Sequence, residues 1–398
     1  MRALLTNAAA SLALITFGVS GCGGEAAPET PQTAPIDLAA LDVGSFGTTP
    51  RTIGIPNVDR ARLSEGQRLG NFLPTPSEVD SRFAFQSGIE STSVFGFIER
   101  VYTIGDSDKF KEDTPGFVAG FYSWAISHED ILIAESISNT TMIFDSEASA
   151  TAAAVALARR KMASKDTFVP VELRDFPSGQ AFWDPTRQEI FTFRAYRQFV
   201  VYTTLKDNAM LEVQTTNLDA LTSLAIKNYT AIQESLQEFV PTPPENLTEI
   251  AMDHDELLGH SLARPENEIS KNPPGIYDGR GALHLSSTPI EDKKLFEEAG
   301  LEWLGVNGAE IYQAKDARGA DLIATAHSAL NKTLRSTDAP KGLPATKCSE
   351  MKVKKSLADR YHCTLAFDRY VIETRSNQLI DAHQRLSAQY ALLAAKVK

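Results

Sequence analysis

The chain has 398 residues, of which 42% are hydrophobic and 23% charged, enough apolar residues for two folded domains with sizeable cores. Its 51 acidic residues outnumber 39 basic ones and give a formal net charge of −12. An acidic surface of this kind argues against nucleic-acid binding and against polybasic attachment to anionic lipid.

The first 21 residues have the pattern of a lipoprotein signal peptide. Arg2 gives a short positive region, residues 3–19 an apolar region, and Val19-Ser20-Gly21-Cys22 a small-residue cleavage site that ends in a thiol. In such a lipobox the thiol is acylated and a peptidase then cuts before it. We therefore expect residues 1–21 to be removed and Cys22 to carry lipid. An ordinary secretory signal and a transmembrane anchor with an incidental cysteine are the alternatives.

The segment that follows Cys22 predicts a flexible tether. Residues 23–35 contain no aromatic or large aliphatic side chain and so cannot contribute to a core. We place the tether at residues 22–36 and the rest of the chain on the extracytoplasmic face of the cell membrane. Cleavage leaves 38 basic and 51 acidic residues, a formal charge of −13. Two or three acyl chains on Cys22, rather than charge, are expected to hold the protein to the membrane.

Strand and helix signals follow in an order that predicts an N-terminal α+β domain at residues 37–240. Apolar runs at 116–126 and 131–137 flank His128-Glu129-Asp130 like the arms of a hairpin. A strand at 139–144 then leads through Asp145-Ser146-Glu147, a helix N-cap signature, into an Ala-rich helix at 148–161. A β-branched and aromatic strand at 197–204 and an amphipathic helix at 217–239 complete the series.

The same order returns later in the chain and indicates a duplication. The second copy has a strand at 308–312, a helix after Asp316 to Asn331, a strand at 368–375 and a helix at 378–396. Ile143 and Ile311 are 168 residues apart, and the strands that begin at Arg197 and Asp368 are 171 apart. Because pairwise identity is slight, the ordinary alternation of elements in an α+β domain is the alternative explanation.

The predicted fold class is α+β, with two similar domains, each an antiparallel sheet with helices packed on one face. Three prolines within residues 240–246 end the long helix and cannot belong to a central strand. A second proline-containing loop follows at 264–275. We therefore predict a linker at 241–275 and a C-terminal α+β domain with one disulfide at 276–398.

The predicted disulfide joins Cys348 and Cys363, which remain once Cys22 is assigned to lipid. An even pair in an oxidising compartment usually forms a disulfide. The loop of about 15 residues is worth about 3 kcal/mol in the chain-entropy model. A redox pair, which usually has a C-x-x-C spacing absent here, and a metal site with His362 are the alternatives.

The densest polar cluster of the sequence lies at residues 253–260 and supplies the metal-ligand candidates Asp253, His254, Asp255 and His260. Histidines six residues apart lie on different faces of a helix, unlike the i, i+4 pair of a zinc helix. A solvated acidic linker helix is therefore the preferred interpretation. The other histidines are isolated: His128 in a predicted turn, His284 at a strand start, His327 and His383 in helices, and His362 beside Cys363.

Motifs for catalysis are absent from the sequence. It contains no G-x-S-x-G elbow, no S-x-x-K with K-T-G, and no P-loop. The short run Asp278-Gly279-Arg280-Gly281 suits a turn rather than a phosphate cradle. We predict no catalytic residue and no cofactor. The richest aromatic set predicts either a sheet core or a groove for an apolar ligand, and it comprises Phe117, Phe121, Tyr122, Trp124, Phe191, Phe193, Phe199 and Tyr202.

Residues 36–51 resemble the opening signature of a family of uncharacterised two-domain lipoproteins from mycolic-acid-producing actinobacteria. The Phe-Val-Ala-Gly pattern at 117–120 and the Phe-Asp-x-x-x-x-Ala run that begins at Phe144 extend the resemblance over nearly the whole mature chain. The resemblance implies a cell-envelope lipoprotein with an N-terminal and a C-terminal domain. It brings no activity and no functional residue apart from the lipidated Cys22.

Three classes of function stay open. The preferred one is a lipid-anchored, non-enzymatic envelope protein that binds an apolar envelope ligand or a protein partner in a cleft between the duplicated domains. A cell-wall or lipid-processing hydrolase with a non-local active site is the second. A structural or accessory subunit of an envelope complex is the third. The sequence indicates no nucleic-acid partner, and it does not determine the oligomeric state.

Overall fold

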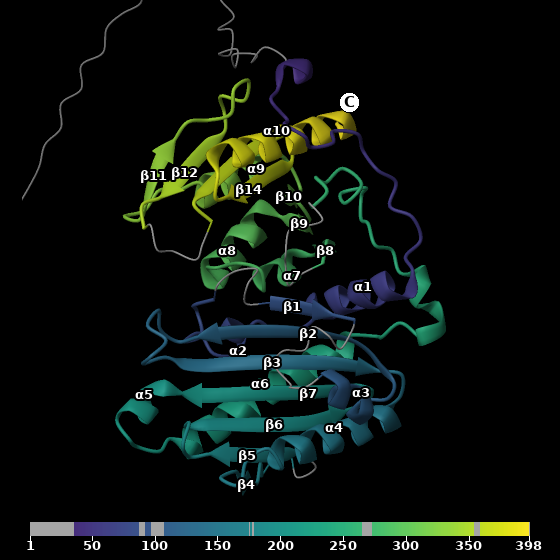
Figure 1. Ribbon diagram of the computed structural model, residues 1–398, viewed down its shortest axis with the longest axis vertical. Helices are drawn as coiled ribbons and strands as arrows, with labels where there is room; N and C mark the ends of the chain where they lie inside the picture. The colour runs from purple at the N-terminus through teal and green to yellow at the C-terminus, as the bar shows by residue number, and fades with distance from the viewer. Residues whose placement is uncertain are drawn as a thin grey trace, which may run out of the picture. The chain divides into compact units, whose positions relative to one another are not determined.

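Two antiparallel sheets of seven strands, here sheet A and sheet B, organise the computed structural model (Figure 1). The structure describes residues 36–86, 92–96, 107–174, 176, 179–264, 273–353 and 359–397. The N-terminal half of the chain carries sheet A and the C-terminal half carries sheet B. The predicted α+β class, with two similar domains built on antiparallel sheets, is confirmed.

Sheet A has the strand order β1-β2-β3-β7-β6-β5-β4. Its strands are β1 (Thr92–Phe95), β2 (Phe117–Ile126), β3 (Glu135–Phe144), β4 (Val169–Val171), β5 (Gln180–Asp184), β6 (Glu189–Tyr196) and β7 (Phe199–Asp207). The helices of this half are α1 (Val58–Gly70), α2 (Pro76–Val79), α3 (Ser107–Asp113), α4 (Glu147–Met162), α5 (Asn208–Glu212) and α6 (Leu218–Glu238).

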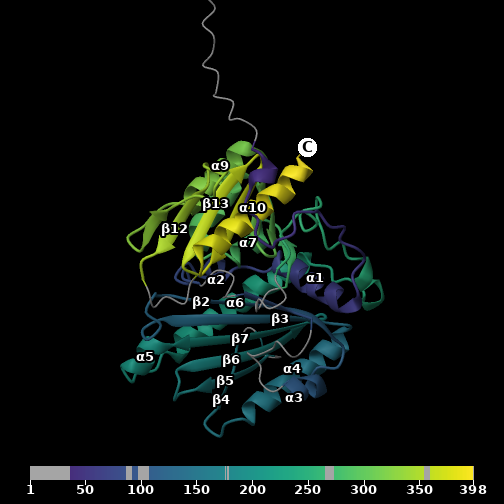
Figure 2. The same ribbon diagram turned by 45° about the horizontal axis from the view of Figure 1, so that its top comes forward.

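Sheet B has the strand order β11-β12-β13-β14-β10-β9-β8. Its strands are β8 (Gly275–Tyr277), β9 (Leu301–Val306), β10 (Glu310–Ala314), β11 (Leu334–Thr337), β12 (Lys347–Met351), β13 (Tyr361–Phe367) and β14 (Tyr370–Ser376). The helices are α7 (Gly279–Leu283), α8 (Pro289–Ala299), α9 (Ala317–His327) and α10 (Leu379–Lys396), and α10 runs across the sheet (Figures 1 and 2).

The two sheets have the same topology. Read from β8 to β11, sheet B repeats the order of sheet A, with β10 in the place of β3 and β14 in the place of β7. Both hairpins that precede the long C-terminal helices turn through two residues, and the first of each pair, Arg197 or Asp368, has a positive φ. This match supports the duplication and the predicted 171-residue offset of β7 and β14.

The predicted 168-residue offset between the first strands of the two copies is wrong by two residues. The bond from Phe144 N to the carbonyl of Gln198 corresponds to the bond from Ala314 N to that of Arg369. The N-caps of the following helices, Ser146 and Asp316, give the same offset of 170. The apolar patterns of the strands do not set this register, because a shift of two residues keeps every side chain on the same face.

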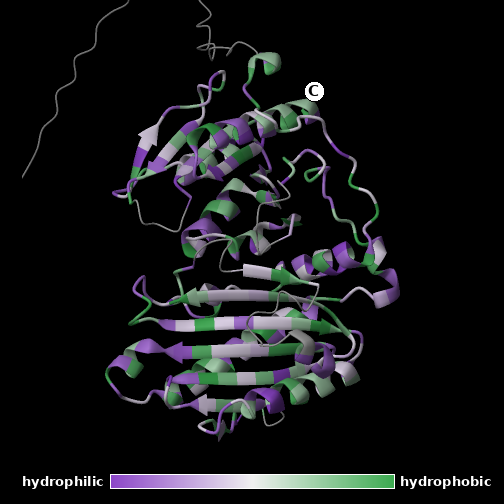
Figure 3. Ribbon diagram, viewed as in Figure 1, coloured by the Kyte–Doolittle hydropathy of each residue, from purple (hydrophilic) through white to green (hydrophobic). Residues whose placement is uncertain are grey.

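The prediction that helices cover one face of each sheet is also wrong. On β7, Val200 and Tyr202 pack toward α4, whereas Leu205 packs toward α6 on the opposite face. Sheet B likewise has α10 on one face and α8 and α9 on the other. The physical reason is visible in the sequence of β7, where Phe-Val-Val-Tyr is apolar at consecutive positions, as is typical of a strand buried on both sides. Figure 3 shows hydrophobic stretches in green along the strands of sheet A.

One hydrophobic core joins the two halves. It combines Phe121, Phe199 and Phe239 from the N-terminal half with Tyr277 and Phe296 from the C-terminal half. Leu38–Lys398 accordingly forms a single compact unit. The cleft expected between two domains is thus filled by side chains where the described residues of the halves meet.

The segments predicted as the linker and the domain start contribute to these cores. Leu247 lies in the shared core, and Leu257 and Leu258 pack beneath α10. Leu41, assigned by prediction to the N-terminal domain, packs in that same C-terminal core, and the Arg51 guanidinium donates to the carbonyl of Ser261 over 2.9 Å.

Candidate functional site

The lipidation site predicted at Cys22 lies outside the described residues. The predicted disulfide is present: Cys348 on β12 faces Cys363 on β13 across neighbouring strands, with an S–S distance of 2.00 Å. His383 places a ring nitrogen within 4.8 Å of both sulfurs. The bonded sulfurs offer no thiolate to a metal. The metal alternative with His362 also fails, since His362 points to the opposite face of the sheet from its neighbour Cys363.

The four metal-ligand candidates of residues 253–260 do not converge. The segment is a series of turns rather than the predicted helix. Asp253 accepts hydrogen bonds from the backbone N–H of Leu258 and Gly259 at 2.7 and 2.9 Å, and His254 stacks on Trp303.

The remaining two candidates, Asp255 and His260, also have other partners. Asp255 lies 3.2 Å from the Lys396 ammonium, and His260 Nδ1 lies 2.9 Å from the Glu256 carbonyl. Each candidate therefore has a structural role in the described fold.

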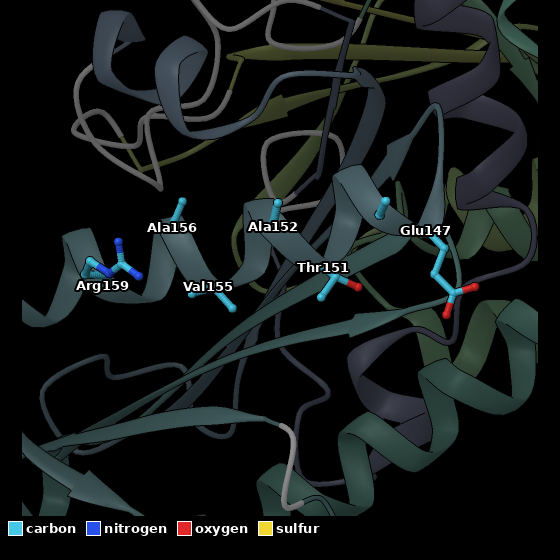
Figure 4. A pocket seen from close by; sticks show the side chains of 7 residues that line it. Glu147, Thr151, Ala152, Val155, Ala156 and Arg159 are labelled. Carbon is cyan, nitrogen blue, oxygen red and sulfur yellow. The ribbon is translucent and has the colours of Figure 1, made fainter.

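The richest aromatic set of the sequence forms core rather than a groove. Its buried members are Phe117, Phe121, Phe191, Phe193, Phe199 and Tyr202, while Tyr122 and Trp124 are half-buried. An open hollow runs instead along α4, where Ala148, Thr151, Ala152, Val155 and Ala156 line it between Glu147 and Arg159 (Figure 4). Its walls are mostly small side chains on one helix face, with Glu147 and Arg159 at its ends.

A buried charge network lies between sheet B and helices α8 and α9. The Glu373 carboxylate, 1% exposed, is 2.7 Å from His327 Nδ1, 3.2 Å from His362 Nε2 and 3.1 Å from an Arg375 nitrogen. On its other side His327 places Nε2 3.5 Å from Asp292, which accepts from the Ser286 hydroxyl. Arg375 also pairs with Glu310, which accepts a hydrogen bond from the Tyr312 hydroxyl over 3.1 Å.

The charges of this network compensate one another. Burial alone would raise the pKa of Glu373, but His327 and His362 hold it well below its ordinary value. Burial alone would lower the pKa of His327, but Glu373 and Asp292 raise it to about 10. At neutral pH Glu373 and His327 therefore form a charged pair, and Arg375 lies beside the same carboxylate.

The duplicated fold shows what the same positions hold in the N-terminal half. With the offsets established above, Leu157 stands where His327 does, Phe191 where His362 does, and Tyr202 where Glu373 does. All three are buried in one apolar core under α4. The architecture thus accepts an apolar core here, and the charges of the C-terminal half are a specialisation of one copy.

The two copies also differ on the α6 face of sheet A. There Phe176, Arg194 and Tyr229 form a cluster, here called the Arg194 cluster. The Arg194 guanidinium carbon lies 3.9 Å from the ring centre of Phe176 and 4.2 Å from that of Tyr229. The corresponding residue of sheet B is Leu365, which is buried in the core beneath α10.

The polar atoms of the Arg194 cluster lack partners. Nε and Nη1 of Arg194 and the hydroxyl of Tyr229 are buried and make no hydrogen bond in the described structure. Burial lowers the pKa of Arg194 and raises that of Tyr229 to about 12. Buried donors without acceptors cost stability, and in this the cluster differs from the Glu373 carboxylate, which has three partners within 3.2 Å.

Neither cluster was identified from the sequence alone. The members of the Arg194 cluster are separated by 18 and 35 residues, and those of the network come from five elements. His284, predicted at a strand start, instead caps α7 and is fully buried, with Nε2 3.1 Å from the Leu73 carbonyl. The useful signal was Arg194 itself, a charged residue at a position where the repeated strand has leucine.

Comparison with family models resolves the chain into two matched parts. Residues 54–252 match the N-terminal domain of a family described as a domain of unknown function, DUF7373, and residues 257–396 match the C-terminal domain of the same family. The chain belongs to the DUF7373 family. The predicted membership of an uncharacterised two-domain family is confirmed at this level, while the lipoprotein and actinobacterial parts stay predictions.

The two DUF7373 domains coincide with the two sheets, since β1 to β7 fall in the first match and β8 to β14 in the second. No curated protein matches the chain. Within the described residues, none of the helices of this DUF7373 protein combines the length and the apolar character that a membrane span requires.

Proposed function

We propose that the protein is a lipid-anchored component of the cell envelope and that its folded part binds a ligand at the Arg194 cluster without chemical conversion. The observation that carries the binding role is the set of buried donors on Arg194 and Tyr229 that have no acceptor within the described structure. The fold does not require the Arg194 donors, because the equivalent strand position is occupied by the buried Leu365. Unpaired buried donors lower stability, and residues that lower stability in only one copy of a duplicated fold are typical of a binding site.

The anchor is supported by the sequence. Cys22 ends a lipobox, and residues 23–35 give a tether without core-forming side chains. Replacing Cys22 with alanine removes the thiol that acylation requires, while the folded part keeps its own core.

We expect the Cys22→Ala variant to lack the acyl mass and to keep residues 1–21, because acylation of the thiol precedes the cut. Intact-mass analysis of the protein purified from the native envelope measures both effects. A Ser20→Ala variant, which keeps the thiol, is the control. A wild-type chain without acyl mass on Cys22 would contradict lipid anchoring.

A hydrolase receives less support from the described residues. The cluster richest in titratable groups is the charge network, and there Glu373 already faces His327, His362 and Arg375. A general base needs a free lone pair beside the reacting group, and a nucleophile needs such a base. The pairing of the network favours binding over catalysis.

Native mass spectrometry of the protein purified from its own envelope tests the binding role. We expect a co-purified ligand of defined mass in the wild type and a lower occupancy in Arg194→Leu. A ligand-free protein that also binds none of the candidates offered below would contradict the proposal.

A further inference from the structure

We propose that the ligand group bound by the Arg194 cluster is an anion, a carboxylate or a phosphate. This inference rests on the proposed binding role and names the chemistry of that site.

The first argument is the kind of atom that the cluster lacks. Arg194 Nε and Nη1 and the Tyr229 hydroxyl are all able to donate a hydrogen bond, and all three are buried without an acceptor in the described structure. Carboxylate and phosphate oxygens are acceptors only, and they accept charge-assisted hydrogen bonds from a guanidinium. An acceptor-rich group therefore completes the cluster.

The second argument is charge. The chain carries a formal charge of −12, yet within the described structure no carboxylate forms an ion pair with Arg194. The buried carboxylate of Glu373, by contrast, has His327, His362 and Arg375 as partners. A neutral acceptor would satisfy the hydrogen bonds but would leave a partly buried positive charge uncompensated.

The third argument is orientation. The rings of Phe176 and Tyr229 pack edge to face with their centres 4.7 Å apart, and the guanidinium carbon lies 3.9 and 4.2 Å from those centres, so its position is set before the ligand binds. A fixed donor set loses little conformational entropy on binding. Phe176 and the neighbouring Tyr196 are half-buried, and they give the site apolar walls that suit a ligand with a hydrocarbon part.

The anion has two sources, a free small anion or the headgroup of an envelope lipid. Isothermal titration of the full chain carrying Cys22→Ala with inorganic phosphate, dodecanoate, dodecyl phosphate and dodecanol separates them. Binding of inorganic phosphate indicates a free anion. Binding of dodecanoate or dodecyl phosphate alone indicates a headgroup with its chain.

The variants test the role of each donor. We expect Arg194→Leu to weaken binding of the anionic probe about tenfold or more, as the loss of a charged hydrogen bond implies, and Tyr229→Phe to weaken it less. Arg318→Leu, which removes an exposed arginine of α9, is the matched control and should leave binding unchanged. Because Leu365 occupies the equivalent position, Arg194→Leu should keep or raise the melting temperature, so loss of binding is not loss of folding.

The failures of the two proposals are distinguishable. Equal binding of dodecanol and dodecanoate that Arg194→Leu does not change, or a co-purified neutral ligand retained by that variant, would overturn the anionic assignment and leave the binding role. Absence of any co-purified ligand together with no binding of the four probes would overturn both, and water would then satisfy the buried donors.

Discussion

Glu373 and His327 interact as an ion pair inside a protein half whose twin has Tyr202 and Leu157 at the same places. Their protonation is therefore linked to folding. The folded pKa of His327, about 10, exceeds its unfolded value, so its contribution is fully present below about pH 6.5 and is lost as the pH rises through about 10. Glu373 has a depressed pKa, so its contribution is lost only in acid, below its unfolded value.

We expect the free energy of unfolding of the wild type to fall between pH 6.5 and 10, and we expect His327→Gln to remove that slope. The fall should amount to at least about 1.4 kcal/mol, the equivalent of one pKa unit. Denaturant unfolding at a series of pH values measures it. The exposed His128 provides the control variant, His128→Gln, which should keep the slope. An unchanged slope in His327→Gln would mean that the pair does not stabilise the folded state.

The partner of a single residue could be predicted only for the cysteines, from their even number and from the oxidising compartment expected for the protein. Cys348 and Cys363 were paired correctly because they were the two cysteines left after Cys22. The pairing of His327 with Glu373 depends on which face of β14 meets α9, and the stacking of Arg194 on Tyr229 depends on how α6 crosses β6. Neither relation leaves a local pattern in the chain.

The duplicated fold packs a helix on equivalent faces of the two sheets, once through apolar side chains and once through charged ones. The α4 face of sheet A packs Leu157, Phe191 and Tyr202, and the α9 face of sheet B packs His327, His362 and Glu373 at the same places. Buried ion pairs are often no more stabilising than apolar residues of similar size, whereas removing one partner leaves an uncompensated charge.

We therefore predict opposite outcomes for two changes under α9. Glu373→Leu alone should lower the free energy of unfolding by about 3–5 kcal/mol, because it leaves two imidazoles and Arg375 without their shared anion. The combined change His327→Leu, His362→Phe and Glu373→Tyr should cost much less, or stabilise. Chemical denaturation compares the two. A triple variant less stable than the single one would show that this half of the fold depends on its charges.

At the scale of elements the sequence was a good guide to order and a poor guide to faces and registers. Strong apolar runs and N-cap residues located β3, α4, β7 and α6 and their counterparts, because these signals are local. The predicted helix to Asn331 ends at His327, and the first offset was two residues too short. Both errors concern features that tertiary packing decides. Packing can end a helix before its local propensity does, and the partner strand sets the register.

At the scale of the whole molecule, the family models divide the chain near residue 255, but the core does not divide there. Buried polar contacts cross the same boundary. Gln67 of α1 donates to the carbonyls of Pro273 and Pro274, and Thr92 of β1 donates to the carbonyl of His284 over 2.6 Å. An isolated half would expose apolar side chains and lose acceptors for these donors, both of which disfavour its folding.

The shared core predicts that the two halves unfold together in one cooperative transition. Phe239 from the N-terminal half and Phe296 from the C-terminal half belong to that core, whereas Phe191 lies in the separate core under α4. Replacing either Phe239 or Phe296 with alanine should cost about 3–5 kcal/mol and shift the same calorimetric transition, with no second one left behind. Phe191→Ala is the informative control, because cooperative unfolding requires it to shift that one transition too. Two resolved transitions, with Phe191→Ala moving only one of them, would instead mean that each sheet folds alone and that the core between them is an interface between independent domains.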